Sequence, residues 1–145
     1  MFIRKKTSFH RIRESICIVI ISLATALLFS GCTKQDDYPK TNDLDYTVVT
    51  GGEVPDELRK MINERKDSAF QLSFSCAGEL YIAKGYGKQL SPGFSITVNE
   101  LYLSDNYIVF DTELYGPKQK TNSKTQSYPY IVIKTEYINK SIVFK

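Results

Sequence analysis

Hydrophobic and polar residues alternate with a period of two over most of the chain after residue 69. Phe70, Leu72 and Phe74 alternate with polar neighbours, and similar runs recur to the end of the sequence. This period is that of a β-strand with one covered face. The apolar positions change parity near Asn99-Glu100, which predicts a β-bulge. Seven strands are predicted, over residues 46–49, 70–76, 79–84, 94–103, 108–114, 131–133 and 142–144.

One stretch has helical spacing instead. Residues 55–66 begin with Pro55, carry acidic residues in the first turn and basic residues in the last, and place Leu58, Met61 and Ile62 on one stripe. Proline at the first position and this charge order both favour a helix. Hairpin turns are expected at 77–78 and 104–106. The pattern therefore predicts an α+β fold: a mostly antiparallel sheet of about seven strands with one N-terminal helix packed on it.

The N-terminal pattern differs from both. Residues 1–14 are basic, residues 16–29 are apolar, and Ser30-Gly31-Cys32 follows. This order is typical of a secretory signal, and the apolar run is shorter than the ~20 residues of a membrane-spanning helix. Its end resembles a bacterial lipobox, which implies cleavage before Cys32 and lipid attachment to that cysteine. The alternative is an anchor helix that is never cleaved.

We therefore expect three parts: a signal peptide (1–31), a lipidated polar tether (32–45) and a folded domain (46–145). The expected location is the outer face of a bacterial cell membrane, with either a one- or a two-membrane envelope. The formal charge of +3 comes from a leader with five basic residues, and the remainder is near neutral. A near-neutral chain offers no electrostatic case for binding nucleic acid.

The sequence after the leader lacks the usual means of catalysis. His10, the only histidine, lies in the leader, and Cys76 is the one cysteine inside the domain. A serine or cysteine nucleophile needs a neighbouring base, and zinc needs several cysteine or histidine ligands. We expect no enzyme activity, no metal and no cofactor; an unrecognised carboxylate enzyme is the less favoured alternative. The parity of Cys76 with Phe70, Leu72 and Phe74 predicts a buried, slow-reacting thiol.

A glycine-rich stretch, residues 85–96, contains the connection between the predicted strands 79–84 and 94–103 and the first residues of the second. Three glycines, a proline and two aromatic residues in so short a segment indicate a shaped loop. Exposed aromatic side chains often anchor protein interfaces. The predicted partner-contacting residues are Tyr86, Ser91, Pro92, Gly93, Phe94, Tyr128 and Tyr130. In the alternative interpretation the aromatic residues cover the end of the sheet and the glycines allow a close backbone approach.

The domain resembles the C-terminal domain of the PrcB family, over about residues 46–145. Members are known as subunits of a spirochaete surface protease complex and as related lipoproteins of other bacteria. The resemblance implies a non-catalytic, membrane-tethered partner of a surface protease. The residues that carry it are Glu53-Val54-Pro55 with Leu58, Leu80-Tyr81-Ile82-Ala83, Gly85-Tyr86-Gly87, Gly93-Phe94-Ser95-Ile96-Thr97-Val98, Gly116-Pro117 and Tyr128-Pro129-Tyr130-Ile131-Val132-Ile133.

Two functional hypotheses follow. The first is an accessory or adaptor lipoprotein that binds another envelope protein, with a protease as the partner that the resemblance implies. The second is a small protease inhibitor that acts through the 85–94 loop. The two classes differ in whether the domain inhibits proteases directly.

Overall fold

The computed structural model describes residues 38–118 and 125–145 of the chain. In chain order the elements are β1 (Asn42–Asp43), β2 (Thr47–Val48), the 3-10 helix η2 (Gly51–Glu53), α2 (Asp56–Arg65), β3 (Ala69–Cys76), β4 (Glu79–Tyr86), β5 (Ser95–Leu103), β6 (Tyr107–Tyr115), β7 (Tyr130–Glu136) and β8 (Ser141–Phe144).

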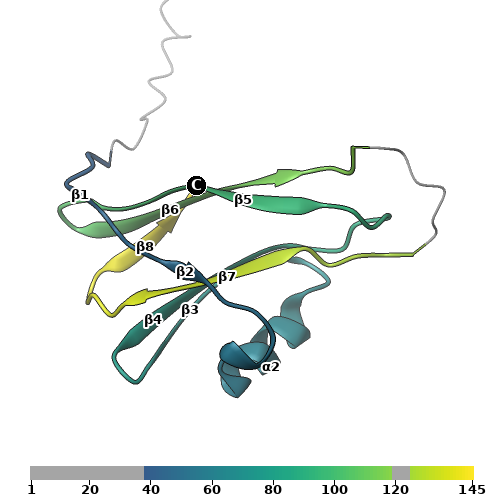
Figure 1. The fold of residues 1–145 in the computed structure, drawn as a ribbon, viewed down its shortest axis with the longest axis horizontal. Coiled ribbons are helices and arrows are strands. Elements are labelled where there is room, and N and C mark those ends of the chain that lie inside the picture. The colour runs from purple at the N-terminus through teal and green to yellow at the C-terminus, as the bar shows by residue number, and fades with distance from the viewer. Residues whose placement is uncertain (1–37, 119–124) are drawn as a thin grey trace, which may run out of the picture. The chain divides into compact units, whose positions relative to one another are not determined.

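The strands of the described residues form two four-stranded sheets. Their orders are β1-β5-β6-β8, called sheet A below, and β2-β7-β4-β3, called sheet B. All pairs are antiparallel except β6 with β8, which run parallel. Figure 1 shows the sheets as two layers with α2 outside sheet B. The α+β class is confirmed, whereas the strands number eight and are divided between two sheets.

Sheet B has apolar residues on both faces, which explains the layered arrangement. On β4, Leu80 and Ile82 join the core between the sheets, while Ala83 joins the core beneath α2. Successive strand residues point to opposite faces, so one strand can serve both cores. The core beneath α2 contains Val49, Val54, Leu58, Ile62, Phe70, Leu72, Ala83 and Val132. The core between the sheets contains Leu80, Ile82, Leu101, Ile108, Phe110, Ile131 and Ile133.

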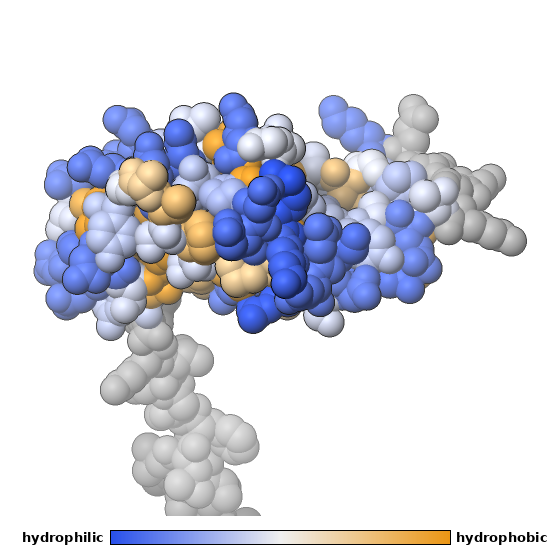
Figure 2. All heavy atoms as spheres, turned by 90° about the horizontal axis from the view of Figure 1, so that it is seen from below, coloured by the Kyte–Doolittle hydropathy of each residue, from blue (hydrophilic) through white to orange (hydrophobic). Residues whose placement is uncertain are grey.

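The helix forms as the sequence predicts. Pro55 is its N-cap residue, Asp56 and Glu57 occupy the first turn, and Leu58 and Ile62 are buried against sheet B. Its charged side chains lie on the outer face, and in Figure 2, viewed from the α2 side, hydrophilic residues cover much of the surface. The apolar stripe therefore holds α2 on the sheet, and its charged face is solvated.

Two local features of the strands were also predicted. The register between β5 and β6 shifts between Val98 and Glu100, which confirms the bulge. Residues 77 and 78 form the two-residue turn between β3 and β4, and both have positive φ, 52° at Ala77 and 81° at Gly78. These angles are those of the hairpin turn whose twist matches the strands.

The N-terminal part of the domain begins earlier than expected. Residues 38–45 belong to the predicted tether, but β1 lies within them and pairs with β5. Backbone N–H groups of Thr41 and Leu44 donate to Leu103 and Leu101, at 2.8 and 3.1 Å. Leu44 also packs against the core between the sheets. A two-residue strand of polar residues has no periodic signal, so its pairing could not be predicted.

The expected burial of Cys76 is wrong. Its thiol is exposed at the end of β3, and Phe74 is only half-buried. The parity gives the correct face, but β3 is the edge strand of sheet B, and burial on this face decreases from Leu72 through Phe74 to Cys76.

We therefore predict that a thiol reagent labels Cys76 rapidly in the native protein. Cys76→Ser should change the free energy of unfolding by no more than about 0.5 kcal/mol, since exposed positions tolerate such changes. Labelling followed by mass spectrometry, with and without denaturant, checks this. A thiol that reacts only after unfolding would contradict it.

Candidate functional site

Hydrogen bonds connect the glycine-rich loop, residues 87–94, to a segment that is distant in the sequence. Gln89 and Ser127 form an isolated antiparallel bridge, with N···O distances of 2.8 and 3.1 Å. The Ser127 hydroxyl donates to the Ser91 carbonyl oxygen at 2.6 Å. The loop therefore has a defined conformation next to the segment that leads into β7.

Two glycines are required by the path of this loop. Gly87 and Gly93 have φ values of 71° and 92°, a region that favours glycine. A Cβ at Gly87 would lie 3.0 Å from the backbone nitrogen of Ala69, and one at Gly93 would lie 3.1 Å from the Cβ of Pro117. The structural interpretation of these glycines is therefore supported: they allow close packing at this end of the domain.

Gly85 belongs to β4 rather than to the loop. It is buried and pairs with Phe70 on β3 and with Tyr130 on β7. The Phe70 ring lies over it, so that a Cβ at Gly85 would be only 2.1 Å from the ring atom Cε1. Because Gly85 has no side chain, the Phe70 ring can occupy this position in the core beneath α2.

Tyr86 points between the two sheets. Its hydroxyl donates to the carbonyl oxygen of Thr112 at 2.8 Å and lies 2.7 Å from the Thr112 hydroxyl. The ammonium group of Lys84 lies 5.3 Å from the centre of its ring. Tyr86 thus connects β4 of sheet B with β6 of sheet A, which is a structural role.

Tyr128 and Tyr130 lie on the other face of sheet B, near α2. The Lys66 ammonium group is 5.4 Å from the centre of the Tyr128 ring, and the rings of Phe70 and Tyr130 are 6.4 Å apart. Tyr130 is 45% exposed. Tyr86 and these two tyrosines, which the sequence places in one surface, are therefore on opposite faces of sheet B.

The other predicted residues share the end of the domain where loop 87–94 lies. Ser91, Pro92 and Phe94 are half-buried and Gly93 is exposed. The Phe94 ring approaches Gly116, whose Cβ would lie 3.8 Å from it. The structure thus brings this part of the prediction together around the loop and the end of β6.

Sequence reasoning missed the most exposed apolar residue of this surface. Leu90, in the middle of the loop, is 81% exposed, the highest value among the exposed large hydrophobic residues of the described chain. A single leucine between polar residues of a glycine-rich loop is the signal that could have indicated it. We call Leu90, Pro92 and Phe94, with Tyr115 on β6, the loop surface.

Tyr115 was missed as well. It is 46% exposed, and its hydroxyl donates to the Glu113 carboxylate at 2.7 Å. This hydrogen bond, together with the negative charge of Glu113, raises the pKa of the Tyr115 hydroxyl. Asp111, the other carboxylate of this strand, accepts from the Asn99 side chain at 3.1 Å.

Other functional features can be located only where the structure describes the chain. Within residues 38–118 and 125–145, no group of three or more His, Cys, Asp or Glu residues could hold a metal ion. The same residues contain no helix long and apolar enough to cross a membrane. Cys32, the predicted lipid-attachment residue, and the predicted signal peptide lie outside the described residues.

A protein-family model matches the central strands of the chain. Residues 80–136 match the PrcB C-terminal family model. The PrcB resemblance is confirmed over this segment, which is narrower than residues 46–145. Comparisons with curated proteins and with solved structures give no match.

The PrcB C-terminal match runs from Leu80 on β4 to Glu136 at the end of β7. It therefore includes loop 87–94, both sides of the Gln89–Ser127 bridge, and the strands that hold Tyr86 and Thr112. The Glu53-Val54-Pro55 motif, α2, β3 and β8 lie outside it. The loop surface lies within the segment that the family model matches, whereas β3 lies outside it.

Proposed function

We propose that the protein is a non-catalytic accessory subunit that binds another envelope protein, with a protease as its partner. The observation that carries this is the PrcB C-terminal match over the strands that present loop 87–94. The PrcB family includes subunits of a surface protease complex, so the match suggests association with such a complex. The proposal assigns partner binding to the loop surface.

The geometry of the loop surface supports this assignment. Leu90 is largely exposed, while the backbone on both sides of it is held by the bonds to Ser127 and by the packing of Gly93 on Pro117. An apolar side chain on a rigid loop can enter a pocket of a partner without a large loss of conformational entropy. The held backbone therefore favours binding of a partner through Leu90.

In this proposal Tyr86 has a structural role and is not a contact residue. Its hydroxyl is engaged by Thr112, so it positions the first residues of the loop and does not contact the partner. Ser91, Pro92, Gly93 and Phe94 remain predicted contact residues. Tyr128 and Tyr130, on the α2 side, form a second predicted contact region.

Isolation of the full chain from detergent-solubilised membranes tests the proposal. We expect an envelope protease to be recovered with it in stoichiometric amount, and the protease to keep its activity in the complex. Recovery of no envelope protein under gentle conditions would contradict the proposal.

A second function, protease inhibition through loop 87–94, is favoured by the same hydrogen-bonded loop with its exposed Leu90. Inhibitor loops act as rigid segments that fit an active-site cleft. Incubation of the full chain with broad-specificity proteases separates the two functions. Tight inhibition with protection of the loop from cleavage supports the inhibitor, and unchanged protease activity supports the adaptor.

We also propose that Cys32 carries a lipid that anchors the chain to the outer face of the cell membrane. One acyl chain binds a membrane only marginally, so stable anchoring requires the two or three chains of a lipobox cysteine. Mass spectrometry of the membrane fraction should show a chain that begins at a modified Cys32. An uncleaved chain with an unmodified Cys32 would contradict this prediction.

A further inference from the structure

Strand β3 is an edge of sheet B with none of the usual protection. It pairs with β4 along all of Ala69–Cys76 without a register shift, and no other strand of the described residues lies on its far side. Its sequence, Ala-Phe-Gln-Leu-Ser-Phe-Ser-Cys, contains no charged residue, proline or glycine. Natural edge strands normally carry charges, proline or bulges, or are short, because a bare edge pairs with other strands.

The turn after β3 shows which of its backbone groups are free. In a two-residue hairpin with positive φ at both turn residues, the flanking residues exchange both of their hydrogen bonds. Here these residues are Cys76 and Glu79. Because bonding alternates along the strand, every second residue from Cys76 bonds to β4. The N–H and C=O groups of Ala69, Gln71, Ser73 and Ser75 are therefore directed away from β4.

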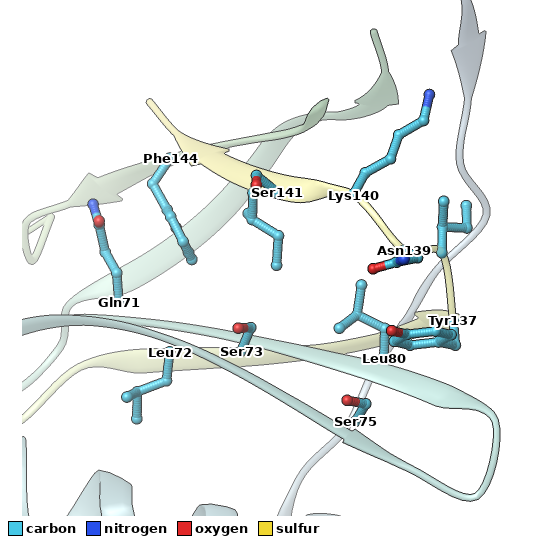
Figure 3. A pocket seen from close by; sticks show the side chains of 12 residues that line it. Gln71, Leu72, Ser73, Ser75, Leu80, Tyr137, Asn139, Lys140, Ser141 and Phe144 are labelled. Carbon is cyan, nitrogen blue, oxygen red and sulfur yellow. The ribbon is translucent and has the colours of Figure 1, made fainter. Parts of the chain in front are cut away.

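The side chains of β3 also divide into two sets. Phe70 and Leu72 pack beneath α2, whereas Gln71, Ser73 and Ser75 point into a groove of about 420 Å³ between β3 and β8. Figure 3 shows Leu72 on one side of the strand and both serines on the side of Phe144 and Ser141. A strand added to β3 would thus need apolar residues on the α2 side and small polar residues on the groove side.

We propose that β3 pairs with β3 of a second copy of this chain, in antiparallel orientation about a two-fold axis at Leu72. In this register Ala69 lies opposite Ser75 of the second copy, and Gln71 lies opposite Ser73. Every outward-directed residue of each edge then meets an outward-directed residue of the other. A register centred on Ser73 would place Ala69 opposite the turn, so it would form fewer hydrogen bonds.

The same register matches the side chains on both faces. Phe70 lies opposite Phe74 of the second copy and Leu72 opposite Leu72, so the half-exposed Phe74 ring gains an aromatic neighbour. On the groove side, amide and hydroxyl groups lie opposite one another. Apolar and aromatic cross-strand pairs of this kind stabilise a sheet. The second copy therefore supplies both the hydrogen bonds and the residue types that the edge lacks.

The proposed dimer cannot grow into a longer assembly through β3. A two-fold interface uses the same edge of both copies, so that neither β3 is left to bind a further chain. The result is a dimer in which the two copies of sheet B form one continuous sheet. The exposed Cys76 lies past the paired residues and is not part of a linkage between copies.

Introduced cysteines can test this register in the full chain in detergent. In a background with Cys17→Ser, Cys32→Ser and Cys76→Ser, which leaves no native thiol in the full chain, one sample carries Gln71→Cys, a second carries Ser73→Cys, and the two carry different affinity tags. Mixing them under mild oxidation should give a disulfide-linked heterodimer in at least tenfold excess over the linked homodimer of either variant alone. Equal linking in all samples would overturn the register, and no linking in any sample would overturn the interface.

A charge on the edge tests the interface independently of disulfide chemistry. Ser73→Lys places a charge at the exposed outer strand and should weaken dimerisation at least tenfold in sedimentation measurements. Thr97→Lys, an exposed position on β5, is the matched control and should leave the dimer intact. Unfolding curves of both variants verify that each is folded. A monomeric parent chain at tens of micromolar, or a dimer that survives Ser73→Lys, would overturn the proposal.

Discussion

Gly85→Ala is expected to lower the free energy of unfolding by about 2–4 kcal/mol, although the same change in an ordinary strand is mildly stabilising. The added Cβ would lie 2.1 Å from Cε1 of Phe70 and 2.6 Å from two further ring atoms. The ring cannot withdraw freely because Phe70 is 8% exposed and has Tyr130 beside it. Overpacking costs about 1–3 kcal/mol, and partial loss of a buried phenylalanine adds to this.

Thermal unfolding measures the effect, with a fall in Tm of roughly 4–8 °C for each kcal/mol in a domain of this size. Gly52→Ala is the matched control, since a Cβ there meets nothing within 4 Å. Combining Gly85→Ala with Phe70→Leu removes the colliding ring and should recover part of the loss relative to the sum of the two single changes. A Gly85→Ala protein as stable as the parent chain would show that the Phe70 ring is not fixed over Gly85.

Leu90→Asp is expected to reduce recovery of the envelope partner at least tenfold while leaving Tm almost unchanged. The side chain is 81% exposed, so it adds little to the folded state. At an interface, however, an introduced carboxylate would be desolvated without a counter-charge, which costs several kcal/mol. The measurement is recovery of the partner from solubilised membranes, together with a melting curve.

Two control variants test whether the effect of Leu90→Asp is specific to the loop surface. Val48→Asp puts the same charge on an apolar residue of β2 that is 48% exposed, and partner recovery should not change. Tyr86→Phe removes the hydroxyl that bonds to Thr112, so stability should fall by about 1–2 kcal/mol while the partner is retained. If Leu90→Asp still recovers the partner, or if Val48→Asp loses it equally, the loop surface is not the binding site.

The sequence predicted those parts of the fold that depend on local pattern. The stripe of Leu58, Met61 and Ile62 defined the helix, the change of parity located the bulge after Val98, and Ala77-Gly78 located a hairpin turn. Each of these is determined by residues a few positions apart. The division into two sheets is not, because a period of two shows that a strand has a covered face but not which strand covers it.

The candidate site was predicted less completely for the same reason. Loop 87–94 was recognised from its glycines, but its contacts with Ser127 and Pro117 join residues that are distant in the sequence. Tyr86 looked like an interface residue because its partner, Thr112, could not be foreseen. Cys76 was expected to be buried because parity gives the face of a strand and not how far the neighbouring layer extends over it.

The pairing of the strands has a consequence for the order in which this chain acquires its structure. The hairpins β3–β4 and β5–β6 join neighbours in sequence, whereas β2 pairs with β7, Thr47 opposite Lys134, and β8 pairs with β6 from the end of the chain. Contacts between residues so far apart require the closure of long loops, which slows folding. The two hairpins can therefore form while the chain is still emerging, but neither sheet is complete until residues 130–144 are present. A chain that is exported N-terminus first during its synthesis would therefore complete its folding on the far side of the membrane.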